Sequence, residues 1–301
     1  MDSSTVQPSW NLVTDLQLLF QYHFMHNAFL AGTIVAVVAG VVGYYMVLRA
    51  QAFAGHALAH VGFAGATGAL LLGVSPIVGL LAVGLGAAMG IGALEERQGS
   101  ARLGGGVAVA GVFTFGLGLG LLFLQLYSGQ AENAYAILFG AVLGINDSDV
   151  VTIMVTAIVT LVLLAAIARP LLFASLDPDV AQARGVPVRA LSIGFLVLLA
   201  FAVAEAVQVV GTLLIFALLV TPAAIAQHVT ARPSRAIGLS VVFALLFTWS
   251  GLVVAYFGPY NVVGFYVTTF AFGTYLLVLL VSTVRHSLAG RTHPIREEAA
   301  A

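Results

Sequence analysis

Residues 150–169 read VVTIMVTAIVTLVLLAAIAR, an apolar run with no charged residue before Arg169 at its end. A helix needs about 20 mostly apolar residues to cross the roughly 30 Å hydrocarbon layer of a membrane. The other segments of the 301-residue chain are similar, since 61% of all residues are hydrophobic and only 8% are charged. A soluble domain is roughly a quarter charged. The sequence therefore predicts an all-α polytopic membrane protein.

Further apolar runs, bounded by polar residues or by Gly and Pro, predict eight more spans. With 150–169 they make about nine transmembrane helices: 28–48, 57–73, 76–94, 106–126, 189–207, 209–229, 236–257 and 264–284. The segment AENAYAILFGAVLGI contains an apolar part at 134–145 that is too short for an upright span. We interpret it as a short re-entrant or tilted helix.

The basic residues test this count, because cytoplasmic loops of membrane proteins collect Lys and Arg. The chain has 11 basic residues, all arginine. Nine crossings with the N-terminus outside place every arginine on one side, whereas an additional crossing at 134–145 would divide them between both faces. We therefore expect a multi-pass membrane protein. It would have an interfacial segment at 1–27, a transmembrane domain at 28–284 and a cytoplasmic tail at 285–301.

Two missing residue types exclude several classes of activity. Without lysine the chain cannot form a nucleotide-binding P-loop, so any ATP hydrolysis would take place on a separate partner chain. Without cysteine it cannot form a thiolate metal site. We expect no enzymatic activity from the chain itself, and membrane lipid rather than nucleic acid as its surroundings.

The loop SLDPDVAQARGVP, at 175–187, has the signals of a short capped helix. Asp177 suits the N-cap, Asp179 the first turn, Arg184 the last turn and Gly185 the left-handed position after the helix. The loop is either a capped connector or a docking element for a cytoplasmic partner.

Ionisable residues inside spans are costly and are candidates for function. His56 and His60 are four apart in AFAGHALAHVGFAG, so both imidazoles lie on one helix face. They form either a packed core pair or a metal contact, and two imidazoles favour zinc over manganese. Three weaker candidates follow. A helical stripe that could line a polar path consists of Glu205, Gln208 and Thr212. An outer gate could use His23 and His26, and His228 could act on the exit side. The alternatives are pairing of Glu205 within the bundle and structural roles for the three histidines.

Four motifs in order resemble those of the permease subunit of bacterial zinc, manganese and iron ABC importers, the ABC-3 type metal permeases. They are VVGYYMVLRAQAFAGHALAHVGFAG at 41–65, AYAILFGAVLGI at 134–145, LDPDVAQARGVPV at 176–188 and VVGTLLIFALLVTPAAIAQHV at 209–229. The resemblance implies a permease fold of the vitamin B12 importer type, a dimer, cytoplasmic ABC ATPase subunits and an extracytoplasmic metal-binding protein. It also implies that 28–284 is a permease domain in the bacterial plasma membrane and that 176–188 is the coupling helix that contacts the ATPase.

The resemblance extends to the histidines. The family has approximately FxGDxLxH in its second span, where the Asp and the His meet the transported metal. His60 matches that His, whereas His56 stands where the family has Asp. The implied metal contact is therefore direct for His60 and only positional for His56.

We therefore expect a subunit, most simply of a homodimer, that imports a divalent metal ion by alternating access. Zinc is favoured, with manganese or iron as alternatives, and no cofactor is bound permanently. Three other functions stay open: a siderophore or haem importer, a secondary carrier driven by an ion gradient, and a membrane scaffold or sensor. A carrier would transport without the ATPase, and a scaffold would show no flux.

Overall fold

The structure is a computed structural model that describes residues 21–98, 104–127, 138, 140, 144–258 and 262–290. Most of the predicted re-entrant segment 134–145 lies outside the described residues, as do residues 1–20 and the tail from 291 onward. The side chains of 285–290 are also outside the description.

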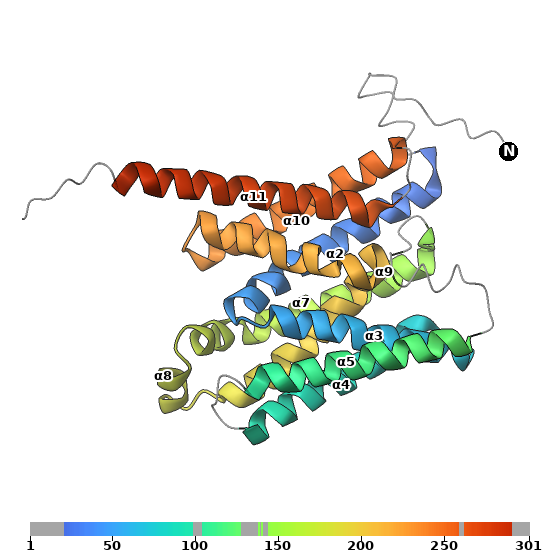
Figure 1. The fold of residues 1–301 in the computed structure, drawn as a ribbon, viewed down its shortest axis with the longest axis horizontal. Coiled ribbons are helices and arrows are strands. Elements are labelled where there is room, and N and C mark those ends of the chain that lie inside the picture. Colours follow the sequence, from blue (N-terminus) through green and yellow to red (C-terminus); the bar gives the residue numbers. More distant parts are fainter. Residues whose placement is uncertain are drawn as a thin grey trace, which may run out of the picture.

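The described part of the chain is all-helical and contains no strand (Figure 1). Its helices are α2 (His23–Leu48), α3 (Ala52–Leu71), α4 (Pro76–Gln98), α5 (Gly104–Leu126), α7 (Asp147–Leu176), α8 (Pro178–Ala183), α9 (Val188–Val229), α10 (Pro233–Phe257) and α11 (Val263–Gly290).

Seven helices or helix segments among the described residues are long and apolar enough to cross a membrane. They lie in α2, α4, α5, α7, the first half of α9, α10 and α11. The two remaining predicted spans fall on α3 and on the shorter apolar helix Ile215–Val229. Because α2 begins at His23, the last residues assigned to the N-terminal segment continue directly into the first span.

Helix α9 is a hairpin of two antiparallel halves. Gly211 interrupts it with a φ of 79° and a ψ of 167°, values that suit glycine because it has no Cβ. Ser192 in the first half accepts a hydrogen bond from Arg49, and Gln227 in the second half donates one to the carbonyl of Tyr44. In a straight helix Ser192 and Gln227 would be about 50 Å apart. Tyr44 and Arg49 are only five residues apart at the end of α2, so Ser192 and Gln227 lie near the same point. The chain must therefore reverse at Gly211.

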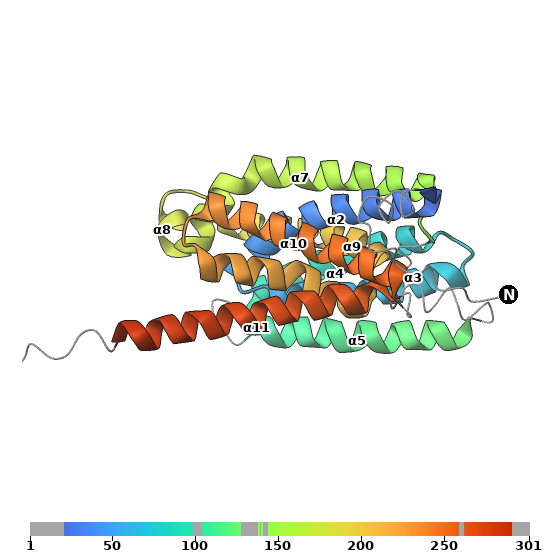
Figure 2. The same ribbon diagram turned by 90° about the horizontal axis from the view of Figure 1, so that it is seen from above.

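The helices form layers around α2, α3 and α9. Figure 2 shows α7 along one face of the bundle and α5 with α11 along the opposite face. Two glycines let α3 pack closely between its neighbours: a Cβ on Gly65 would collide with the backbone of Gly79 in α4, and one on Gly116 in α5 would collide with Val61. Small residues are what allow helices to approach closely inside membranes.

Arginines gather at one end of the bundle, where α8 and the α9–α10 turn lie (Figure 1). The Arg49 guanidinium donates to Ser175 at the end of α7, at 3.1 Å, and to Ser192 near the start of α9, at 2.6 Å. The same guanidinium lies over the ring of Phe195, 5.6 Å from its centroid. This group joins α2, α7 and α9 beside α8. We call this end the arginine-rich end; it carries Arg49, Arg184, Arg189, Arg232 and Arg235.

Candidate functional site

The histidine pair of α3 lies one to two turns inside the helix, counted from the arginine-rich end. The ring centroids of His56 and His60 are 4.6 Å apart, with the ring planes at 79°. His60 is buried, with 6% of its surface exposed, and His56 is half-buried. The spacing therefore brings both imidazoles together, as the sequence predicts.

Aromatic rings from two other helices enclose this pair. Phe113 of α5 stacks on His56 at 5.5 Å and meets His60 edge-on at 5.0 Å. Phe216, in the second half of α9, meets His56 edge-on at 5.6 Å. The site is thus built where α3, α5 and the second half of α9 converge. The rings that contact the pair, Phe113 and Phe216, are apolar.

Both histidines have a buried Nδ1 atom without a hydrogen-bond partner. A buried polar atom that lacks a partner carries a desolvation penalty, which a bound ligand would relieve. Among the described residues, no third His, Cys, Asp or Glu joins the pair to make a group of three. The pair could therefore supply two nitrogen ligands to a metal ion, and the remaining ligands would come from elsewhere.

Glu205 does not join the histidines. It is buried, with 1% exposure, in the first half of α9, and its Oε1 accepts a hydrogen bond from Thr160 of α7 at 3.3 Å. The predicted stripe also includes Gln208 and Thr212, whose Nε2 and Oγ1 atoms are buried without a partner. Because Gly211 interrupts the helix, Thr212 belongs to the second half, and the three residues do not form one continuous helical stripe.

The predicted short helix is present as α8. Asp177 is its N-cap, with Oδ1 accepting a hydrogen bond from the Val180 amide at 3.0 Å, and Asp179 lies in its first turn. Arg184 is the C-cap residue, and Gly185 follows with a φ of 81°. The capping signals in the sequence thus correspond to the observed geometry. The helix stands at the arginine-rich end of the bundle, packed against the end of α7.

The remaining candidate histidines lie at the two ends of the bundle. His23 forms an exposed ion pair with Asp147, with 2.8 Å between Nε2 and Oδ1, and Asn27 donates to the same carboxylate at 2.6 Å. These contacts tie the start of α2 to the start of α7. His26 is exposed in the first turn of α2. His228 is exposed at the other end of the second half of α9, and its Nδ1 lies 2.9 Å from the carbonyl oxygen of Ala224.

Comparison with known proteins identifies the family. The ABC 3 transport family matches residues 21–282, which is most of the chain. The chain belongs to the ABC 3 transport family. The expected resemblance to ABC permeases is therefore confirmed, and the protein is a multi-pass membrane permease of this family.

Three similar proteins illustrate the relationship. The manganese transport system membrane protein MntC of Listeria monocytogenes is 31% identical over 80% of this chain and 85% of its own length. A probable iron transport system membrane protein of Haemophilus influenzae is 27% identical over 78% of this chain and 86% of its own. The solved structure of PsaBC from Streptococcus pneumoniae, in complex with Fab, has a TM-score of 0.78 and 29% identity. That match covers 89% of this chain and 95% of the other.

Sequence reasoning did not find the aromatic walls of the site or the Arg49 group. Phe113 and Phe216 are two of 19 phenylalanines, and nothing in the spacing indicates which of these meet the histidines. Arg49 had a usable signal, since it stands just before the histidine helix, within the motif at 41–65.

Proposed function

We propose that this chain is the permease subunit of an ATP-driven importer for a divalent transition metal ion. The observation that carries the proposal is the His56 and His60 pair, with two unpartnered buried nitrogen atoms inside the membrane region. The names of the similar proteins, which transport manganese or iron, support a metal ion as the cargo.

Zinc is the cargo that the pair favours. Two neutral imidazoles suit zinc and other borderline ions, whereas manganese prefers the carboxylate that the family has at the position of His56. A transport site must also release its ion, so two protein ligands from one subunit suit a transient site better than a closed shell of four.

The incomplete ligand set supports a dimer. Two imidazoles leave a tetrahedral ion two ligands short. Helices α5 and α11 lie along one face of the bundle and carry many exposed apolar residues, and the half-buried His56 stacks on Phe113 of α5 (Figure 2). A second copy against this face would cover these residues and bring a second histidine pair to the metal path.

Energy would enter at the arginine-rich end, which the positive-inside rule makes cytoplasmic. In that orientation the chain crosses nine times, with α9 crossing twice, its N-terminus outside and its C-terminus inside. Helix α8, with Asp177, Asp179, Arg184 and Gly185, would then contact a separate ABC ATPase subunit. An extracytoplasmic binding protein would deliver the metal at the opposite end. The permease itself would have a fold of the vitamin B12 importer type. Alternating access would open the site to each side in turn.

The test is reconstitution in proteoliposomes with the ATPase and binding protein that accompany this chain. ATP hydrolysis and uptake are measured with zinc, manganese and iron(II). We expect metal-stimulated hydrolysis and uptake, with zinc preferred. Uptake without the ATPase would indicate a secondary carrier, uptake only of a siderophore or haem a chelate importer, and no flux a scaffold.

A further inference from the structure

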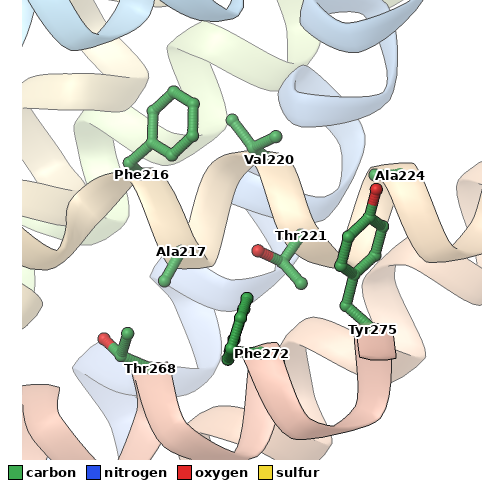
Figure 3. Close-up of a pocket in the computed structure, with 8 residues that line it drawn as sticks. All are labelled: Phe216, Ala217, Val220, Thr221, Ala224, Thr268, Phe272 and Tyr275. Atoms are coloured by element: carbon green, nitrogen blue, oxygen red, sulfur yellow. The ribbon is translucent and has the colours of Figure 1, made fainter. Parts of the chain in front are cut away.

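Two hollows lie along the second half of α9 and α11, and we call them together the α9–α11 groove. Its first hollow, of about 460 Å³, is lined by Phe216, Ala217, Val220, Thr221, Ala224, Thr268, Phe272 and Tyr275 (Figure 3). Its lining includes Phe216, which meets His56 edge-on. Phe216 is therefore a wall that the first hollow shares with the candidate metal site.

Tyr275, which lines the first hollow, contacts His228. The rings of these two residues are perpendicular, with their centroids 6.2 Å apart. His228 also lines a second hollow of about 420 Å³, together with residues of α11 that include Thr274 and Ser282. From Phe216 to His228 the helix advances about 18 Å. The two hollows thus follow one side of α9 from the interior of the bundle to its end.

The hydrogen bond of His228 prepares its other nitrogen for a cation. A carbonyl oxygen only accepts hydrogen bonds, so Nδ1 must donate its proton to Ala224, at 2.9 Å. In the neutral ring Nε2 then holds the lone pair. Metal-binding histidines in proteins are commonly oriented by this same bond from the second ring nitrogen to a backbone carbonyl.

We propose that His228 is the exit ligand for the transported metal, which passes from His56 along the α9–α11 groove and is met by Nε2 at the cytoplasmic mouth. This inference rests on the proposed function. The hydroxyl groups of Thr221, Thr268 and Tyr275 supply oxygen atoms along the way, as Figure 3 shows. A single imidazole, completed by water, holds the ion weakly enough for release.

Two variants separate a ligand from a structural histidine. His228→Ala removes the ring, whereas His228→Asn keeps an amide N–H that can reach the Ala224 carbonyl but has no Nε2. We expect both variants to lower zinc and manganese uptake, on the order of tenfold, the lower end of the loss when groups around a metal site are removed. Ile158→Ala, a change of an exposed residue of α7 that lines neither hollow and lies away from α5 and α11, serves as the control and should transport normally.

The path between the sites can be probed because the chain has no cysteine. Single Thr221→Cys and His228→Cys variants, in the reconstituted complex, receive a small membrane-impermeant thiol reagent from the cytoplasmic side. We expect modification to block uptake, and zinc supplied during turnover to slow the labelling. Ser234→Cys, at an exposed position at the start of α10 that lines neither hollow, is the control for reaction at a surface outside the path.

The outcomes distinguish the two proposals. If the wild type takes up metal and His228→Ala does so equally well, His228 is not an exit ligand, and the importer proposal stands. The same holds if only His228→Asn transports normally. Failure of the reagent to reach Thr221→Cys, or labelling there without loss of uptake, would overturn the path. No metal uptake by the wild-type complex would overturn the proposed function itself.

Discussion

The membrane region of this protein contains two buried polar centres with opposite surroundings. The histidine pair of α3 faces phenylalanine rings, and its two Nδ1 atoms have no partner. Glu205 of α9 faces α7, where the Thr160 hydroxyl donates to its carboxylate. Ionisable residues inside a membrane are functional candidates by default. Glu205 also has an unpartnered atom, Oε2, so the difference is that one of its oxygens bonds to a neighbouring helix, whereas neither Nδ1 has such a partner. We infer that this partner favours a packing role for Glu205 and a binding role for the histidines.

Replacing His60 is the strongest way to break this comparison. We expect His60→Ala to reduce metal uptake to background, because it removes the more deeply buried of the two nitrogen ligands. Uptake in proteoliposomes measures the effect, and co-purification with the ATPase shows that the subunits still assemble. Near-normal uptake by an assembled His60→Ala complex would remove the histidine pair from the transport path.

Exchange of His56 sharpens the comparison by changing the ligand chemistry rather than removing it. His56→Asp restores the carboxylate of the family motif, and oxygen ligands suit manganese better than a second imidazole does. We expect the ratio of manganese uptake to zinc uptake to rise by roughly tenfold, which corresponds to about 1.4 kcal/mol. Competition between the two ions in one transport assay measures the ratio, and an unchanged ratio would show that residue 56 does not set metal choice.

Glu205 should respond in stability rather than in transport. Glu205→Gln keeps an acceptor for Thr160, so we expect near-normal uptake. Glu205→Ala leaves that hydroxyl without its acceptor and creates a cavity, and we expect a loss of about 1–3 kcal/mol of unfolding free energy. Denaturation in detergent measures this loss. If Glu205→Gln transports as poorly as His60→Ala, the carboxylate belongs to the metal path and the two centres are not different in kind.

The smallest expected effect concerns the partner of Glu205. Thr160→Val removes one hydrogen bond of the type that contributes about 0.6 kcal/mol on average inside membranes. We expect a slight decrease in melting temperature and no change in metal choice. Comparison with Thr160→Ser, which keeps the hydroxyl, assigns the decrease to the hydrogen bond. A change in metal choice would connect α7 to the path.

Local features of the molecule could be predicted from its sequence. The apolar runs correspond to helices, and the caps around Asp177 and Gly185 locate α8 because these signals act within a few residues. The facing of His56 and His60 follows from helical spacing alone.

Contacts between distant segments could not be predicted in this way. The sequence predicts a break between 207 and 209, but the chain reverses at Gly211. The prediction missed the position because the valines around Gln208 are apolar and fit either half of the helix. Glu205 faces Thr160, 45 residues away along the chain, and Phe113 and Phe216 reach the histidines from two other helices. These pairings depend on how the helices pack, which one sequence does not encode in any local spacing.

The reversal at Gly211 also bears on how the protein enters the bilayer. Its turn has no charged residue, and Val210 and Thr212 are fully buried. Glu205 lies six residues before Gly211, toward the end of the first half of α9. A carboxylate inside the membrane makes insertion less favourable, so this half carries a handicap in Glu205. Insertion of both halves as one unit would spread this handicap over two spans. The translocation machinery would then insert the two halves of α9 together as a hairpin, rather than one span at a time.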